Sequence, residues 1–197
     1  MLWTTGMSSL RELINYIETF CYVGSRFTNV NWHKLRVVNT LGNETVWRVM
    51  AALLEGVELR ADGQPVRFTV EYNADGIVGY RAVEYHAKSI SRLVPIEADI
   101  DYHLKYADRS ALESLKCGLA PDEEPLIVKR GLVTDTTFAN VVFRARSGVL
   151  YTPRTPLLEG TRRAALLDAH ILTTADIAPA DLNSFTDFYL INAMRTL

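Results

Sequence analysis

The segment "DYHLKYADR", residues 101–109, contains a lysine with apolar and aromatic neighbours. Lys105 ends an extended run and is flanked by Leu104 and Tyr106. Partial removal from water lowers the pKa of a lysine amine and makes the amine a better nucleophile near neutral pH. An exposed lysine on an edge strand has the same local sequence and is the more common case. Lys105 is therefore a candidate nucleophile that needs support from other residues.

A second candidate lies in "VTDTTFANVVF", residues 133–143, where Asp135 stands between two apolar, strand-like ends. A polar group taken out of water costs free energy unless it is paired. A buried carboxylate at this place could keep the nitrogen of a heteroaromatic ring protonated. The alternative is a turn aspartate that accepts hydrogen bonds from its own backbone through "TDTT". The local sequence alone favours the turn.

Two further patterns could bind an anion. In "LLEGTRRAALL", Gly160 and Thr161 begin an amphipathic helix, where free backbone N–H groups and the helix dipole attract negative charge. In "HKLR", His33 and Arg36 share one helix face, and the arginine could hold a phosphate with its planar fork of donors. A plain helix start and a solvated helix face are the more common explanations. Each pattern is weak when it is taken alone.

The first half of the chain is expected to form strands and two helices. "YIETFCYV" alternates as a strand does, although a helix is also compatible with its surroundings. Asn31 is predicted to cap the helix "WHKLRVVNTL", which Gly42 ends, and "ETVWRVMAALLEG" forms a second helix that closes at Gly56. The strongest local signal is "VRFTVEYNADGIVGYRAVEY", in which two β-rich runs flank the hairpin turn "NADG".

The pattern of residue types changes near residues 98–103, and a domain boundary is expected there. The second part contains a predicted helix from about Asp108 to Gly118, then strands in "LIVKRGLVTD" and "FANVVFRARSGVLYTP". A helix after "PLLEG", a short helix in "APADLNSF" and a closing strand in "DFYLINAM" follow. Residues 1–100 are thus predicted to form a smaller N-terminal α/β domain, and residues 101–197 a larger C-terminal one.

Composition excludes several classes of protein. The chain has 197 residues and a net charge of −2, and it has no basic stripe, which argues against a general nucleic-acid binder. No apolar run approaches the roughly 20 residues of a membrane helix, and the first residues lack the regions of a signal peptide. The two cysteines, Cys21 and Cys117, suggest neither a disulfide framework nor a metal site. A cytoplasmic protein without membrane or nucleic-acid partners is expected.

The order of these patterns is more specific than any one of them. "NWHKLR", "HLKYADR", "GLVTDTTFANVVFRARSGVLYTPRTPLLEGTRRAALL" and "INAM" together resemble the class IV aminotransferase family. This family comprises the fold-type IV pyridoxal-phosphate (PLP) enzymes, among them branched-chain and D-amino-acid aminotransferases and aminodeoxychorismate lyase. The resemblance is strong over residues 105–197, moderate over 17–40 and loose over 43–100.

The resemblance implies a role for each candidate residue. Lys105 would form the imine bond to PLP and move protons between substrate and cofactor carbons. Asp135, where many members have Glu, would pair with the pyridinium nitrogen. Arg36, Gly160 and Thr161 would hold the cofactor phosphate. Asn192 and Ala193 would line the site near that phosphate.

The sequence also departs from the family pattern. The chain is short for the family, and the shortfall lies in the N-terminal half, which shapes the substrate side of the pocket. "LEGT" lacks a residue that many members place between Gly and Thr, and "KYADR" resembles the lyases more than the branched-chain enzymes.

The resemblance implies an α+β, two-domain fold-type IV architecture with a shortened N-terminal domain. A homodimer is expected, with PLP between the domains, no metal and a small-molecule amino substrate. The reaction is either that of an aminodeoxychorismate lyase or that of an amino-acid aminotransferase. The alternative is a non-catalytic homologue that binds PLP or another ligand without turnover.

Overall fold

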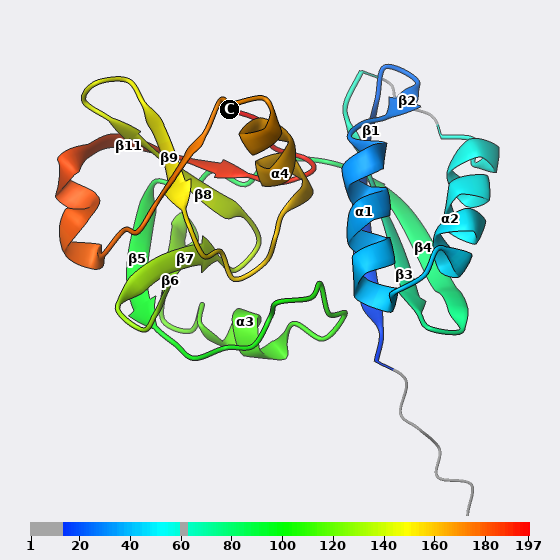
Figure 1. Cartoon of the computed structure of the whole chain (residues 1–197), viewed down its shortest axis with the longest axis horizontal. Coiled ribbons are helices and arrows are strands. Elements are labelled where there is room, and N and C mark those ends of the chain that lie inside the picture. The colour runs from blue at the N-terminus through cyan, green and yellow to red at the C-terminus, as the bar shows by residue number, and fades with distance from the viewer. Residues whose placement is uncertain (1–13, 60–62) are drawn as a thin grey trace, which may run out of the picture.

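The first four strands of the chain form an antiparallel sheet of their own, in the order β2-β1-β3-β4 (Figure 1). The computed structural model describes residues 14–59 and 63–197. The strands are β1 (Tyr16–Val23), β2 (Arg26–Phe27), β3 (Val66–Asn73) and β4 (Gly76–Glu84), and the helices are α1 (Val30–Leu41) and α2 (Thr45–Gly56). This part of the structure is called the small lobe below.

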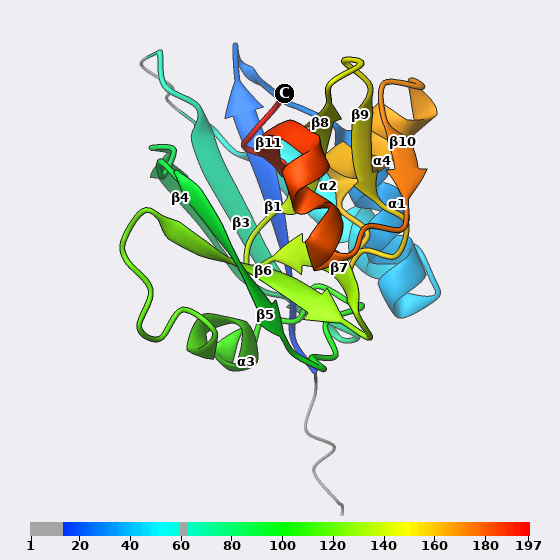
Figure 2. The same cartoon turned by 90° about the vertical axis from the view of Figure 1, so that its left-hand side faces the viewer.

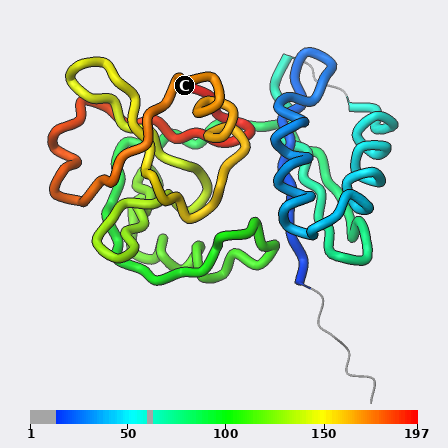
Figure 3. Tube along the Cα trace, in the orientation of Figure 1, coloured from blue at the N-terminus to red at the C-terminus, as the bar shows by residue number. Residues whose placement is uncertain are grey.

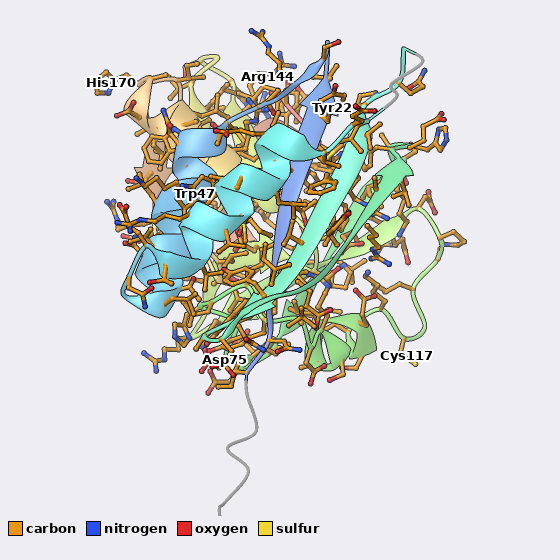
Figure 4. All side chains as sticks on the ribbon, turned by 90° about the vertical axis from the view of Figure 1, so that its right-hand side faces the viewer. Tyr22, Trp47, Asp75, Cys117, Arg144 and His170 are labelled. Atoms are coloured by element: carbon orange, nitrogen blue, oxygen red, sulfur yellow. The ribbon has the colours of Figure 1, made fainter. Side chains whose placement is uncertain are left out.

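Alternation of side chains gives the small-lobe sheet two different faces. Phe20 of β1 and Phe68 and Tyr72 of β3 are fully buried against the two helices, together with Val37 and Met50. Figure 4 shows α2, with the labelled Trp47, lying over the sheet on its outer side. The opposite face of the sheet carries polar side chains and is turned toward the rest of the molecule.

Most expectations for this half are confirmed, and one helix start is wrong. The hairpin forms as predicted: β3 and β4 are antiparallel, Asn73 Oδ1 accepts a hydrogen bond from the Asp75 N–H, and Gly76 has a φ of 146°. Gly42 ends α1 in the left-handed conformation expected of a helix-ending glycine. Asn31 does not cap this helix, because Asn29 adopts a left-handed conformation and the helix begins at Val30.

The remaining strands form a seven-stranded sheet, the core of the large lobe (Figure 2). Its order is β10-β9-β8-β7-β6-β5, and β11 pairs with β8. The strands are β5 (Arg92–Glu97), β6 (Glu123–Lys129), β7 (Leu132–Thr136), β8 (Asn140–Ala145), β9 (Leu150–Pro153), β10 (Thr173–Ala175) and β11 (Phe185–Ile191). The helices are α3 (Ser110–Ser114), α4 (Thr161–Asp168) and a 3-10 helix, η1 (Pro179–Ser184).

The change from one sheet to the other falls between β4 and β5. The sequence placed the division near residues 98–103, with β5 on its N-terminal side. In the structure β5 pairs in parallel with β6 inside the large-lobe sheet. Two parallel strands must be joined by a long crossover connection. The alternation of residues within β5 therefore does not reveal that β6 is its partner.

One element of the large lobe is shorter than predicted. The helix expected from about Asp108 to Gly118 is reduced to α3, which is followed by turns up to Gly118 at a φ of 82°. Gly131 and Gly148 have positive φ values in the tight turns that join β6 to β7 and β8 to β9. In the parts of the chain that the structure describes, no helix is long and apolar enough to cross a membrane. Cys21 is buried and Cys117 is exposed, and both are free thiols.

The two lobes are joined by backbone hydrogen bonds as well as by the connecting chain. The segment around residues 98–109 extends from the large lobe toward β1 (Figure 3). The Ile17 N–H donates to the Lys105 carbonyl at 2.9 Å, and the Ala107 N–H donates to the Asn15 carbonyl at 2.8 Å. Lys105 is thus held at the boundary between the lobes by its own backbone.

Candidate active site

A cavity of about 430 Å³ lies between the polar face of the small-lobe sheet and the large lobe. The seven residues to which the family resemblance assigns a role all line it: Arg36, Lys105, Asp135, Gly160, Thr161, Asn192 and Ala193. They come from α1, from the segment after β5, from β7, from the start of α4 and from the chain after β11. The fold therefore brings together residues that are as much as 157 positions apart in the sequence. Their chemical roles remain predictions.

Lys105 lies in this cavity as a half-buried side chain. Burial lowers the pKa of its amine to about 7, and the positive charges of Arg36 and Arg109 act in the same direction. The Glu18 carboxylate opposes them only in part. A large fraction of the amine is therefore neutral near pH 7, which is the form that attacks a carbonyl carbon or accepts a proton.

Asp135 is only 4% exposed and is held by two hydrogen bonds. Its Oδ1 accepts from Asn140 Nδ2 at 2.7 Å, and its Oδ2 accepts from the Leu158 N–H at 2.9 Å. Burial raises the pKa of this carboxyl to about 7, although these two hydrogen bonds favour the ionised form. Thr136, rather than Asp135, bonds the backbone of the turn, through Ala139. Asp135 is therefore a cavity-lining carboxylate that a positively charged donor would stabilise.

Arg36 is held by a buried glutamate that the sequence analysis did not single out. Glu18 is fully buried and accepts hydrogen bonds from the Arg36 guanidinium and from His33 Nδ1. Burial alone would raise the pKa of Glu18, but the charges of Arg36 and His33 lower it to about 2. Burial lowers the pKa of His33 and so favours a neutral ring that donates from Nδ1. The available signal was a glutamate on the apolar, core-facing side of "YIETFCYV", two positions before Phe20.

The start of α4 lies next to Arg36. Arg36 Nη1 donates to the Glu159 carbonyl at 3.4 Å, immediately before the helix. Thr161, the first residue of α4, is 4% exposed and lines the cavity. A guanidinium beside the positive end of a helix is suited to binding a phosphate or a carboxylate.

Gly160 cannot carry a side chain in this arrangement. A Cβ at this position would lie 1.8 Å from Asn140 Oδ1. Asn140 could not move freely, because its Nδ2 also bonds Asp135 and, at 2.9 Å, the Leu158 carbonyl. The absence of a Cβ at Gly160 thus permits the close approach of the loop to the residue that orients Asp135.

Gly160→Ala is expected to destabilise the protein by about 1 to 3 kcal/mol, since the new methyl group displaces Asn140 and breaks its hydrogen bonds. Urea denaturation followed by circular dichroism measures this change. The control is Gly56→Ala at the end of α2, where a Cβ meets nothing within 4 Å. A Gly160→Ala variant as stable as the wild type would show that Asn140 is not fixed by this contact.

The last predicted residues lie where the chain turns after β11. Asn192 Nδ2 donates to the Phe138 carbonyl at 3.2 Å, and its Oδ1 accepts from the Met194 N–H. Its side chain therefore holds a turn, and this turn places Ala193 and Arg195 at the cavity wall.

Basic side chains predominate among the described residues that line the cavity. Eight are basic, namely Arg36, Arg67, Arg81, Lys88, Lys105, Arg109, Lys116 and Arg195, whereas Glu113 and Asp135 are acidic. Over residues 14–59 and 63–197 no three His, Cys, Asp or Glu side chains are grouped as a metal site would require. The cavity is therefore suited to a ligand with more than one negative charge.

Known proteins resemble this chain over nearly all of its length. A protein from Haemophilus somnus 129PT, provisionally named a 4-amino-4-deoxychorismate lyase, has a structure with a TM-score of 0.81 and 27% identity, and all of both chains is covered. An uncharacterized protein of Haemophilus influenzae is 32% identical over 185 residues, which are 91% of this chain and 97% of that protein. A hypothetical aminotransferase of Mycobacterium tuberculosis in a PLP-bound form has the same fold, with a TM-score of 0.77, 16% identity and coverage of 98% of this chain and 85% of its own.

The family model for class IV aminotransferases matches residues 99–197. This match covers the segment with Lys105, the strand with Asp135 and the loop before α4. The mixed α and β structure is that of the fold-type IV enzymes, as the resemblance implied. The chain belongs to the class IV aminotransferase family.

Proposed function

We propose that this protein is a PLP-dependent enzyme that acts on the amino group of a small-molecule substrate through Lys105. The observation that carries the proposal is the arrangement of the cavity: it holds a lysine of lowered pKa, a buried carboxylate and an anion-binding helix start beside an arginine. PLP carries an aldehyde, a ring nitrogen and a phosphate, which call for these three kinds of group.

The residues present fit PLP. Arg36 and the first N–H groups of α4 would hold the phosphate, with Gly160 allowing the close approach of the loop. Asp135, whose carboxyl is otherwise costly to ionise in this buried place, would gain a cationic N–H donor from the ring. The Lys105 amine is available for the aldehyde. When bound, PLP withdraws electrons from the substrate carbon that bears the amino group.

The chain's own residues then supply positioning and proton transfer. Lys105, with a pKa of about 7, can accept a proton at Nζ and return it at the same pH. Asn140 and the Leu158 N–H fix the plane of the Asp135 carboxylate, so its charge is already oriented when the ligand binds. Glu18 accepts hydrogen bonds from the Arg36 guanidinium and so restricts its orientation before a ligand binds. Arg36 therefore loses less conformational entropy when it binds a phosphate.

The reaction could be a lyase or an aminotransferase reaction, and we favour the lyase. "KYADR" resembles the lyase pattern, and the Haemophilus somnus protein of the same length is provisionally named a 4-amino-4-deoxychorismate lyase. Arg109, the arginine of that pattern, donates to the Thr137 carbonyl at 2.7 Å and to the Tyr102 hydroxyl at 3.2 Å. It thereby fixes the backbone just after Asp135.

Absorbance spectroscopy tests the proposal. Purified protein titrated with PLP is expected to develop a band in the near visible, and Lys105→Ala is expected to lack it because the imine bond cannot form. Lys34→Ala, which removes an exposed lysine on α1, is the control and should keep the band. The absence of a band in the wild type would overturn the proposal and leave a non-catalytic homologue.

Two assays then separate the reactions. Pyruvate release from aminodeoxychorismate identifies a lyase. Amino transfer from D- or L-amino acids to 2-oxo acids identifies an aminotransferase. A protein with the absorbance band but without either activity would bind PLP without turnover on these substrates.

A further inference from the structure

The small-lobe side of the cavity carries two arginines that the proposed cofactor does not use. Arg67 lies on β3 and Arg81 on β4, and both line the cavity. In the sheet register Arg67 is opposite Val83, and Arg81 is opposite Thr69. Because Arg67 and Thr69 are two positions apart on one strand, the two arginines are diagonal neighbours on the same face. Their guanidinium groups can therefore reach one ligand.

Neither arginine has an acidic partner in the described part of the chain. No carboxylate oxygen of residues 14–59 and 63–197 lies within 4.0 Å of either guanidinium, and neither side chain donates a hydrogen bond there. The Nε atom of Arg67 is buried and finds no hydrogen-bond partner among the residues that the structure describes. A buried donor without a partner costs free energy, and two neighbouring cations repel each other. An anion placed between them would relieve both costs.

Other basic residues of the cavity have partners already. Arg36 is bonded to Glu18, Arg109 and Lys116 to Glu113, and Arg195 to the Lys88 carbonyl. Tyr85 lies near Arg67, and burial raises the pKa of its phenol although Arg195 and Arg67 act against this. The uncharged phenol is a further donor at the same place. Among the described residues, Arg67, Arg81 and Arg195 are the cavity arginines without a carboxylate partner, and of these Arg67 and Arg81 share one face of the small-lobe sheet.

We propose that Arg67 and Arg81 form a carboxylate-binding subsite that selects substrates with a second carboxylate, remote from the reacting amino group. The assignment rests on the proposed function in that the carboxylate belongs to the amino substrate. Ile17, whose N–H bonds the Lys105 carbonyl, lies on the same sheet face. Strand spacings put the Arg67 and Arg81 backbones roughly 10 to 15 Å from Ile17. The second carboxylate of the substrate is therefore separated by several atoms from the amino group that lies beside Lys105.

Calorimetric titration of the whole protein tests the subsite without turnover. Glutarate is compared with valerate, and isophthalate with benzoate, so that each pair differs by one carboxylate. Inorganic phosphate is present throughout and is expected to occupy the Arg36 end of the cavity. In the wild type at least one diacid is expected to bind about tenfold more tightly than its monoacid, since a guanidinium–carboxylate pair makes a strong, charge-assisted contact.

Variants identify the arginines responsible. Arg67→Gln and Arg81→Gln are each expected to reduce the preference for the diacid, and the double variant to abolish it. Arg48→Gln, an exposed arginine on α2, is the control and should keep it. Equal binding of diacid and monoacid by the wild type, or a preference that survives in the double variant, would overturn the subsite.

The two proposals fail in different ways. If PLP gives no absorbance band but the diacid preference depends on Arg67 and Arg81, the subsite stands and the enzymatic function falls. If the band appears and depends on Lys105, while the double variant binds diacids as the wild type does, the function stands and the subsite falls.

Discussion

Asp135→Asn is expected to retain bound PLP but to lose turnover by roughly a hundredfold or more. The amide keeps nearly the same shape, and its single oxygen can still accept a hydrogen bond from either Asn140 Nδ2 or the Leu158 N–H. It has no negative charge, however, so it does not keep the ring nitrogen protonated, and the electron withdrawal that the cofactor supplies becomes weaker. The effect is therefore expected on kcat rather than on the affinity for PLP.

Matched variants distinguish this role from a structural one. PLP affinity and turnover are measured for Asp135→Asn, for Asp135→Glu and for Asp187→Asn, which changes an exposed aspartate paired with Arg144. Asp135→Glu keeps the charge and should recover part of the turnover, and Asp187→Asn should behave as the wild type. Unchanged turnover in Asp135→Asn would show that the carboxylate only supports the loop before α4.

Glu18→Gln is expected to destabilise the protein by about 3 to 5 kcal/mol, since it removes one member of a buried charge cluster. The side chain of Arg36 is only 12% exposed, so the variant leaves its charge largely buried and uncompensated. The amide also accepts fewer and weaker hydrogen bonds from His33 and Arg36 than the carboxylate does. Urea denaturation measures the loss, and Glu44→Gln, which changes an exposed partner of Lys34, is the control.

The cluster of Glu18, Arg36 and His33 also makes the free energy of unfolding depend on pH in the acidic range. The pKa of Glu18 is about 2 in the folded protein and 4.5 in its ordinary state, so the unfolded chain binds a proton more readily. Its contribution, about 3 kcal/mol, is complete above pH 4.5 and is lost as the pH falls toward 2. The slope of stability against pH in this interval should be smaller in Glu18→Gln. An equal slope in both proteins would contradict the assigned pairing.

The order of the motifs along the chain singled out several candidate site residues, although each local pattern taken alone favoured a more ordinary explanation. The residues next to them in the sequence form recognisable motifs, and this holds for Lys105, Asp135 and the Gly160–Thr161 pair. All of these residues line one cavity. Glu18, Asn140 and Arg67 were missed for a common reason. Each acts through a partner far away in the sequence, and alternation along a strand tells which side chains share a face but not what lies opposite that face.

The fold was predictable to a similar extent. The β3–β4 hairpin and the end of α1 depend on glycine and turn chemistry within a few residues, and both were predicted correctly. The place of β5 depends on a parallel partner across a crossover, and the start of α1 depends on a left-handed asparagine. Sequence patterns report local preferences, whereas these two features are decided by tertiary packing.

The hydrogen bond from the Ile17 N–H to the Lys105 carbonyl joins residues roughly ninety positions apart. Such a contact closes a long loop, whose entropic cost must be met before the contact can form. Lys105 is therefore expected to reach its place only after both lobes have folded and met. A fragment limited to residues 99–197 would keep Lys105 and Asp135 but would lose the strand that fixes the lysine backbone. Completion of the cavity is thus expected late in folding, once the whole chain has reached its native arrangement.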